Sequence, residues 1–301
     1  MDSGAEDLRH DGGGGQPRAA SSTGFRERTG QLDYLNVGCG DTYHPEWTNV
    51  DMAARSPGVQ ACNLLKGFPY PDGHFQAVYH SHVLEHIPLD KVSNFIGECH
   101  RVLKPGGILR AVVPDLENIV REYLRLLQEN FAHPSPPAAA RYDWIMVELY
   151  EQAVRHVTGG QMGEFAQRLR AVDPDYLAAR IGCWDSPPGG GQPLSGPGRP
   201  AFGEWGKLAR KTARFMGRAA RRLFYSKAHR IGLFRLSGEV HLWMYDRFSL
   251  ARLLKENGFE NIQVQEPFTS AIPDWNRFEL DAKNNAVRFP TSLFMEARRP
   301  Q

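Results

Sequence analysis

The sequence has few of the features that mark secreted or membrane-spanning proteins. Its 301 residues include only four cysteines, at positions 39, 62, 99 and 183, and no two of them have C-x-x-C spacing. Neither a disulfide framework nor a cysteine zinc site is therefore expected, which favours a reduced, cytoplasmic protein. No uncharged apolar run approaches the roughly 18 residues of a membrane-spanning helix. The first thirty residues lack the apolar centre of a signal peptide.

Charge and composition set only broad limits on the fold and on possible partners. The formal net charge of +2 at pH 7 indicates no particular partner. Residues 1–30 are rich in Gly, Ser, Asp and Arg, so we expect a disordered N-terminal tail followed by one large domain over 31–301. A second stretch rich in Pro and Gly, at 186–200, predicts a flexible linker.

The most informative stretch runs from Leu35 to Asp51 and reads LNVGCGDTYHPEWTNVD. Its start predicts a short strand over 33–37 that is covered on both faces, and its end predicts a second strand. Gly38 and Gly40 lie between the strands, where the absence of side chains lets a ligand approach the backbone closely. Asp51 ends the second strand, where a carboxylate suits the paired hydroxyls of a ribose. Together these features predict a nucleoside pocket at the carboxyl edge of a parallel sheet.

Three blocks of sequence resemble the class I S-adenosylmethionine-dependent methyltransferases. They are NVGCGD at 36–41, FPYPDGHFQAVYHSHVLEHI at 68–87 and ECHRVLKPGGILRAVVPD at 98–115. The resemblance extends over about 33–120 and returns near 241–265, and it is closest to a bacterial group associated with cell-surface glycan pathways. It implies an α/β fold with a Rossmann-like seven-stranded sheet, mostly parallel with a C-terminal antiparallel hairpin. It also implies S-adenosyl-L-methionine as the cofactor.

The dinucleotide fingerprint, the main alternative for such a glycine turn, is not matched. Position 43 is Tyr where the fingerprint has its third glycine, and Asp51 comes earlier than the expected spacing of about 20 residues. The chain also departs from the methyltransferase pattern in two respects. Gln76 stands where that family usually has Asp, and the link from the glycine turn to Asp51 is too short for a full first helix.

The resemblance implies a set of cofactor-binding residues. The backbone of Gly38 and Gly40 would hold the amino-acid end of the cofactor, and Asp51 would hold its ribose. Asn63 would contact the adenine with Leu64, although an asparagine at this position equally suits a simple turn. The complete predicted set is Asn36, Gly38, Cys39, Gly40, Asp51, Asn63, Leu64 and Ser81.

A hydroxyl acceptor would require a general base, and three residues are candidates, namely His82, Asp115 and His241, in that order. His82 follows a strand predicted over 75–80. Asp115 follows a strand predicted over 108–113, but it also suits the N-cap of the next helix. For His241 the commoner alternative is a buried, hydrogen-bonded structural histidine.

The segment HVLEH at 82–86 matches the H-x-x-E-H pattern of a zinc hydrolase. In that pattern two histidines on one helical face bind zinc and the glutamate activates water. A further acidic ligand would be needed, for which Glu148 and Glu164 are candidates. Because the segment lies between two predicted strands, as in methyltransferases, we assign no metal ligands. Glu85 and His86 are expected to cap and pack locally.

Residues 116–240 predict a helical insertion or cap, with helices over 116–129 and 142–157. Within the insertion, 207–235 contains ten Lys or Arg residues and no acid. This composition is typical of a helix on an anionic membrane surface, but the commoner alternative is a solvated basic helix covering the cleft. No RNA-binding module is recognisable, so a nucleic-acid partner is not expected. The predicted location is the cytoplasm, with or without contact to the inner face of the membrane.

The C-terminal part returns to the methyltransferase pattern. A helix with Leu250, Leu253 and Leu254 on one face should end at Asn257-Gly258, and strands over 260–265 and 292–298 should form the closing hairpin. The predicted function is methyl transfer from S-adenosylmethionine to an oxygen nucleophile on a small-molecule, glycan or lipid-linked acceptor. Two alternatives remain open, a non-catalytic partner protein that binds the cofactor and a zinc hydrolase.

Overall fold

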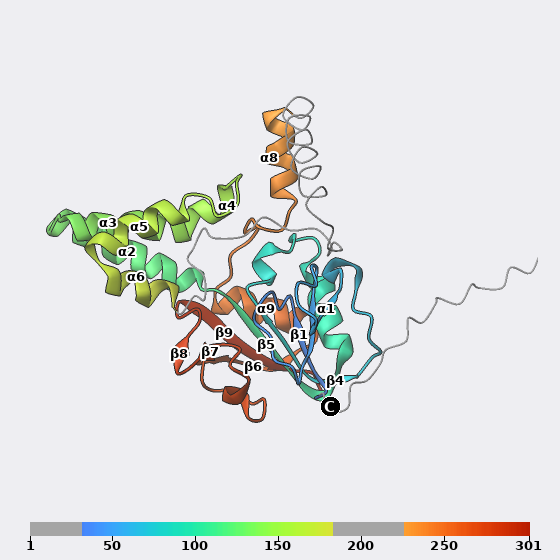
Figure 1. Cartoon of the computed structure of the whole chain (residues 1–301). Coiled ribbons are helices and arrows are strands. Elements are labelled where there is room, and N and C mark those ends of the chain that lie inside the picture. Colours follow the sequence, from blue (N-terminus) through green and yellow to red (C-terminus); the bar gives the residue numbers. More distant parts are fainter. Residues whose placement is uncertain (1–31, 183–225) are drawn as a thin grey trace, which may run out of the picture. The chain divides into compact units, whose positions relative to one another are not determined.

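The computed structural model describes residues 32–182 and 226–301, and a seven-stranded sheet lies at its centre (Figure 1). The strand order is β3-β2-β1-β4-β5-β9-β6. The strands are β1 (Tyr34–Val37), β2 (Thr48–Asp51), β3 (Val59–Ala61), β4 (Phe75–Ser81), β5 (Leu103–Pro114), β6 (Glu260–Gln265) and β9 (Ser292–Arg298). The first five pair in parallel, whereas β9 runs antiparallel to both β5 and β6. The predicted Rossmann-like sheet with its closing hairpin is confirmed.

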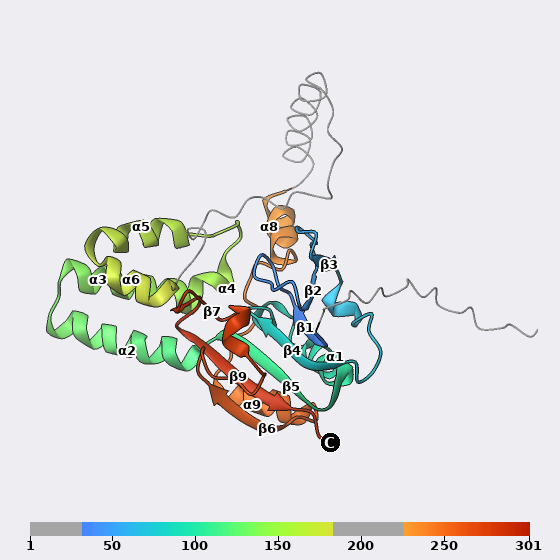
Figure 2. The ribbon, with the colours of Figure 1, turned by 60° about the horizontal axis from the view of Figure 1, so that its bottom comes forward.

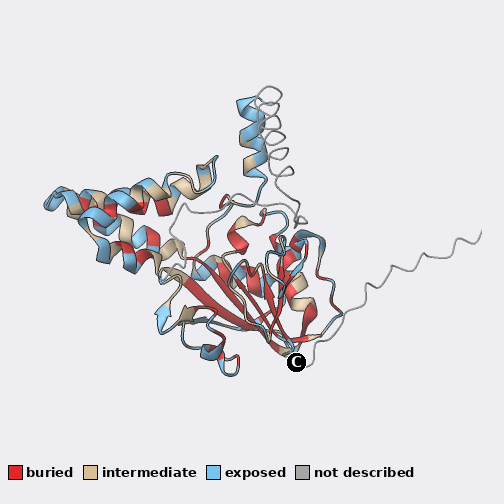
Figure 3. Cartoon of the chain, in the orientation of Figure 1, coloured by how far each residue is buried: buried red, intermediate tan, exposed pale blue. Residues whose placement is uncertain are grey.

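Both faces of the sheet are covered, so most residues of its central strands β1, β4 and β5 are buried, including the polar Asn36, His80 and Arg110. Along β4, Val78 belongs to a core shared with helices α1 (Val92–Val102) and α9 (Arg247–Glu256), whereas Ala77 and Tyr79 belong to a second core. Successive residues of a strand point to opposite faces, so one strand serves both cores. Figure 3 shows that buried residues follow the strands and the inner sides of these helices.

The connection between β6 and β9, which includes β7 (Ala282–Lys283) and β8 (Ala286–Val287), supplies aromatic side chains to the second core. The ring centroids of Trp275 and Phe278 lie 6.2 and 5.3 Å from that of Trp47. These two aromatics, in the short helix η4 (Trp275–Phe278), therefore stabilise the sheet.

The helical region after β5 is built from α2 (Leu116–Ala132), α3 (Pro136–Met146), the π-helical turn η3 (Val147–Glu151), α4 (Gln152–Val154), α5 (Met162–Val172) and α6 (Pro174–Ile181). Neighbouring members pack side by side, as Figure 2 shows for α2, α3 and α5. Trp144, Leu169 and Leu177 form their shared core. The second predicted helix begins at Pro136 rather than at 142, because prolines are tolerated in a first helical turn and Ser135 caps it.

Several predicted features lie outside the described residues. They are the tail at 1–30, the linker at 186–200 and the basic segment as far as residue 225. Only the end of the basic segment is described, as helix α8 (Lys227–Arg235), which contains no buried residue. Contact of the basic segment with a membrane therefore stays a prediction. In the described ranges, no helix combines the length and the apolar character that crossing a bilayer requires.

Candidate functional site

The glycine turn after β1 adopts a backbone conformation that favours glycine at two positions. Gly38 has φ +66° and Gly40 has φ +53°, a region that residues with a Cβ adopt at a cost. A Cβ added to Gly38 would lie 2.4 Å from Cγ2 of Val83, whereas one added to Gly40 would meet nothing within 4 Å. The turn is therefore packed against the segment after β4 at Gly38 and open at Gly40.

Asp51 is fixed beside this turn by backbone donors. Its Oδ2 accepts a hydrogen bond from the Gly40 amide at 3.0 Å, and its Oδ1 accepts one from the Ala53 amide at 2.9 Å. A carboxylate has about four lone-pair positions, so each oxygen can still accept a bond from a ligand hydroxyl. The carboxylate is thus held at the carboxyl ends of two adjacent parallel strands.

The side chains of three other predicted cofactor-binding residues are engaged within the protein. Asn36 is buried and donates to the Thr42 carbonyl at 3.0 Å and to Oδ1 of Asn49 at 3.2 Å, which braces the glycine turn. Leu64 is buried in the core, and Asn63 caps the turn that contains it by accepting from the Leu65 amide at 3.1 Å. Asn63 therefore caps a turn, and its contact with the adenine stays a prediction.

The two remaining members of the predicted set lie at strand ends. Cys39 is buried in the glycine turn, and burial raises the pKa of its thiol to about 12, so it is protonated at neutral pH. Ser81 is the last residue of β4 and is half-buried. The structure therefore brings Gly38, Gly40 and Asp51 together, while Ser81 lies two strands from β2, across β1.

His82 directly follows β4 and has an unusual backbone conformation. Its φ of +54° is uncommon for a residue with a side chain and is often found at functional positions. Its amide donates to the Val112 carbonyl at 2.9 Å. The Nε2 lies 2.9 Å from Oγ of Ser292, and the Nδ1 lies 3.1 Å from Oε1 of Glu85. The ring is therefore positioned between a hydroxyl and a carboxylate.

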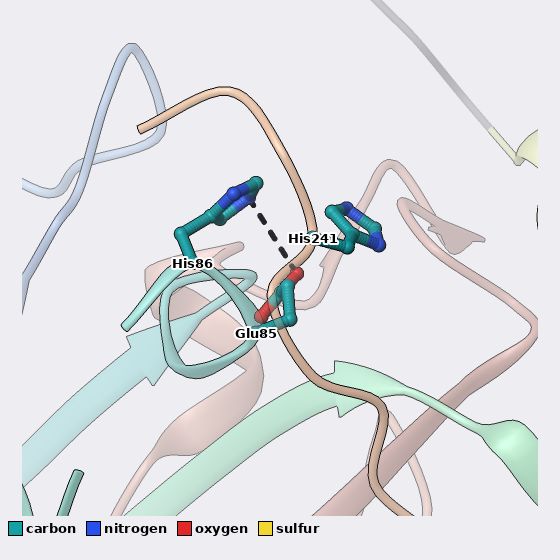
Figure 4. Close-up of side chains that lie close together, drawn as sticks. All are labelled: Glu85, His86 and His241. Carbon is teal, nitrogen blue, oxygen red and sulfur yellow. Dashed lines mark ion pairs between the residues drawn. The ribbon is translucent and has the colours of Figure 1, made fainter. Parts of the chain in front are cut away.

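Glu85 is completely buried and lies next to His86 and His241 (Figure 4). Its Oε1 is 3.9 Å from Nε2 of His86. Burial raises the pKa of the Glu85 carboxyl, but the contact with His82 and the neighbouring histidines outweigh this effect and lower it to about 2. Burial lowers the pKa of His241 to about 3, so its imidazole is uncharged at neutral pH.

Asp115 caps a helix, as its alternative interpretation predicted. Its carboxylate accepts from the Glu117 amide at 3.0 Å at the start of α2. Burial raises the pKa of this carboxyl. The residue before it, Pro114, lines the cavity described next, whereas Asp115 itself does not.

A cavity of about 370 Å³ opens beside the three histidines. Its lining includes His82, His86 and His241, and also Trp144, Glu148 and Arg180 of the helical region. Arg180 donates from Nε to Oε1 of Glu148 at 3.0 Å, and its NH2 forms a second contact with the same carboxylate. The cavity wall therefore contains a positively charged guanidinium, from Arg180, and a negatively charged carboxylate, from Glu148.

The H-x-x-E-H segment does not have the geometry that the zinc-hydrolase alternative requires. Only Leu84–His86 is helical, as a single 3-10 turn, and His82 lies before it, so the two histidines of the segment do not share the face of an α-helix. Of the two proposed further ligands, Glu148 is paired with Arg180, and Glu164 is exposed beside Arg168. Glu85 was expected to cap and pack locally but faces the histidines.

Ser292 and Arg180 also line the cavity, yet sequence reasoning did not identify them. Ser292 is the first residue of a predicted strand, and nothing in its sequence neighbourhood distinguishes it from other strand residues. Arg180 pairs with Glu148 across an interval of 32 residues, and only the packing of the helices determines that pairing.

Comparisons with known proteins find similarity over the region that contains the glycine turn. Residues 35–111 match a family model described as a methyltransferase domain. The chain is 31% identical over 100 residues to a probable S-adenosylmethionine-dependent methyltransferase of Mycolicibacterium smegmatis, covering 28% of this chain and 38% of that protein. It thus spans well under half the length of this curated relative. These matches support a class I S-adenosylmethionine-dependent methyltransferase domain.

Similar solved structures include S-adenosylmethionine-dependent methyltransferases of Archaeoglobus fulgidus and Thermotoga maritima. The first is 11% identical with a TM-score of 0.36, and the alignment covers 90% of this chain and 87% of that one. The second is 10% identical with a TM-score of 0.35, and the alignment covers 88% and 81%. No conclusion about this chain follows from likenesses with such low TM-scores.

Proposed function

We propose that this chain is a class I methyltransferase that moves a methyl group from S-adenosylmethionine to a hydroxyl of a small-molecule, glycan or lipid-linked acceptor. The observation that carries the proposal is the position of the glycine turn. Gly38 packs against Val83, the residue after His82, so the turn lies next to the segment that lines the cavity. A cofactor over the turn would therefore present its methyl group toward the cavity side of β4.

The chain's own residues fit the cofactor at the ends of β1 and β2. Asp51 would accept hydrogen bonds from the ribose hydroxyls, because its oxygens keep free lone pairs beside their two backbone donors. The open side of Gly40 would accept the methionine part without a clash. When bound, the cofactor supplies an electrophilic methyl group on a sulfonium, so the protein mainly has to position the acceptor in line with it.

His82 is the best-placed general base for a hydroxyl acceptor. The carboxylate of Glu85 lies 3.1 Å from its Nδ1, which favours a proton on that nitrogen and leaves Nε2 to accept one. Nε2 faces Ser292, a residue of the cavity wall, so an acceptor hydroxyl in the cavity would approach the same atom. His241 is deeper and Asp115 is outside the cavity lining, which places both behind His82.

The proposed acceptor class is inferred from the residues of the cavity wall and from the family resemblance of the sequence. The paired charges of Glu148 and Arg180 suit a polar acceptor rich in hydroxyls. Trp144 and Phe289 add apolar surface of the kind that packs against sugar rings or the start of a lipid chain. A glycan or lipid-linked glycan satisfies both features.

Cofactor placement is tested by calorimetry with S-adenosylmethionine and S-adenosylhomocysteine. We expect Asp51→Asn to weaken binding by about tenfold to 100-fold, the cost of losing hydrogen bonds to a charged group. Asp41→Asn is the matched control, because Asp41 is exposed and one residue beyond the turn. Equal affinity of the wild type and Asp51→Asn would contradict the placement of the ribose.

Catalysis is tested by the release of S-adenosylhomocysteine with a panel of hydroxyl-bearing sugars, glycolipids and small molecules. We expect His82→Gln to lower the turnover number by about 10²- to 10⁴-fold, as for loss of a general base, with unchanged cofactor affinity. A chain that binds the cofactor but methylates no member of the panel would favour the non-catalytic partner. Transfer to an amine that is insensitive to His82→Gln would overturn the oxygen nucleophile.

A further inference from the structure

The geometry points to a divalent transition-metal site formed by Glu85, His86 and His241, with an open coordination position toward the cavity. One ligand atom from each of the three side chains lies within 4.8 Å of the other two. Figure 4 shows the three side chains close together, Glu85 and His86 on the turn after β4 and His241 on the segment before α9. This site goes beyond the proposed methyl transfer and does not depend on it.

The separations of the ligand atoms are close to those of a metal site. Tetrahedral zinc with bonds of about 2.0–2.2 Å to nitrogen and oxygen requires ligand atoms about 3.4 Å apart. Oε1 of Glu85 and Nε2 of His86 are already 3.9 Å apart. No separation exceeds 4.8 Å, so none would have to shorten by more than roughly 1.4 Å, which a rotation of the His241 ring would have to supply.

The surrounding backbone orients the ligands in the way that protein metal sites require. His86 Nδ1 lies 3.1 Å from the Val240 carbonyl, so the proton belongs on Nδ1 and the lone pair of Nε2 faces Glu85. The carbonyl of Glu85 accepts hydrogen bonds from the amides of Leu242 and Trp243 at 2.7 and 3.3 Å. These bonds attach the segment that carries His241 directly to the turn that carries the other two ligands.

The polar atoms of the cluster also have unused bonding capacity. Oε2 of Glu85 and Nδ1 of His241 are buried without a hydrogen-bond partner among the described residues, and Oε1 of Glu85 has only its 3.1 Å contact with Nδ1 of His82, which is not aligned as a hydrogen bond. Glu85 is fully buried and His241 is 8% exposed. Leaving such atoms unpaired is costly, whereas a bound cation would satisfy them.

The donor set selects the class of metal. Two imidazoles and one carboxylate suit zinc, iron, cobalt or nickel, whereas calcium and magnesium prefer sites made of oxygen ligands. His86 and His241 line the cavity, while Glu85 lies behind them. An ion between the three would therefore present its remaining position to the cavity, as in catalytic sites with three protein ligands. A water molecule or hydroxyl group bound there would be oriented and acidified.

The test is a titration of the chelator-treated full-length protein with Zn²⁺ by calorimetry and with Co²⁺ by visible absorption, without cofactor or acceptor. We expect one equivalent to bind, and Glu85→Gln, His86→Gln and His241→Gln each to weaken binding by at least about tenfold. His133→Gln is the matched control, because His133 is exposed at the end of α2, and it should bind like the wild type. Mg²⁺ and Ca²⁺ should not compete.

Two results would overturn the site. One is the absence of zinc binding by the wild type, and the other is equal binding by all four variants, which would indicate adventitious binding elsewhere. If a ligand variant fails to fold, anomalous diffraction at the zinc edge from wild-type crystals decides instead. A peak between the three side chains supports the site, and a peak elsewhere or none contradicts it. Neither result bears on the cofactor test with Asp51→Asn.

Discussion

Two buried clusters of charged side chains in this chain differ in how completely their polar atoms are paired. In the first, the fully buried Arg110 donates to Asp281 and Glu296 at 2.8 Å each and also to the carbonyls of Thr269 and Glu266 at 2.9 Å. The hydroxyl of Tyr79 donates to the second oxygen of Asp281 at 2.7 Å. Every nitrogen of the guanidinium therefore has a partner.

The second cluster surrounds Glu85 and is not saturated. Both oxygens of this carboxylate and both ring nitrogens of His80 are buried without an aligned hydrogen bond from the part of the chain that the structure describes. His82 and His86 lie near the carboxylate at 3.1 and 3.9 Å, and they also line the cavity. The Arg110 cluster, whose polar atoms are all paired, is positioned to stabilise the sheet. The Glu85 cluster has polar atoms that are unpaired within the described ranges and can therefore still bind a ligand or an ion.

The largest effect is expected from Arg110→Met, which leaves two carboxylates buried without their cation. Removing one partner of a buried ion pair costs about 3–5 kcal/mol of unfolding free energy. Denaturation in urea measures this loss. Arg121→Met is the control, because Arg121 is 73% exposed and its pair with Glu117 contributes at most about 1 kcal/mol. Similar losses for the two variants would show that the Arg110 cluster does not hold the fold.

A smaller effect is expected for the acid sensitivity contributed by His80. Burial lowers the pKa of this histidine from its usual 6.5 to about 4, with the charge of Glu85 opposing. The unfolded chain therefore binds the proton first, and stability falls as the pH drops from about 6.5 toward 4. Between pH 7 and 5 this contribution is about 2 kcal/mol. Urea denaturation at both pH values measures how far the unfolding free energy falls between them. For His80→Leu this fall should be smaller than for the wild type by that amount, and an equal fall in both proteins would contradict the prediction.

Much of the fold was predictable because local signals and the global arrangement agree. Leu35, Val37 and the glycines after them specify a buried strand and a turn, and Leu250, Leu253 and Leu254 specify a helix whose apolar face packs on the sheet. The helix predicted over 142–157 begins earlier, at Pro136, because a proline can also occupy the first turn of a helix. A proline permits either a break or a helix start, and the Ser135 cap distinguishes them only once the backbone is known.

The site was predictable where chemistry lies within one short segment and unpredictable where it depends on packing. Asp51 and Gly40 are close in sequence, and their contact follows from the order of the first two strands. Glu85 and His241 meet only because the segment before α9 bonds to the turn after β4. No periodicity in the sequence encodes that contact, so Glu85 was interpreted as a local packing residue.

The smallest effect on stability is expected from Ser292→Ala, and it sharpens the contrast between the clusters. Ser292 is half-buried and makes a 2.9 Å hydrogen bond with His82 Nε2, so its loss should cost at most about 1 kcal/mol of unfolding free energy. The same change frees the imidazole to rotate away from the cavity, and we expect methyl transfer to fall by about tenfold, which corresponds to 1.4 kcal/mol.

Urea denaturation and release of S-adenosylhomocysteine, measured on one preparation, separate the effect on stability from the effect on the rate. Ser292→Thr should restore the rate because it keeps the hydroxyl. A stability loss as large as that of Arg110→Met with normal turnover would place Ser292 and His82 in the framework of the fold, because only a structural contact removes stability without affecting the reaction.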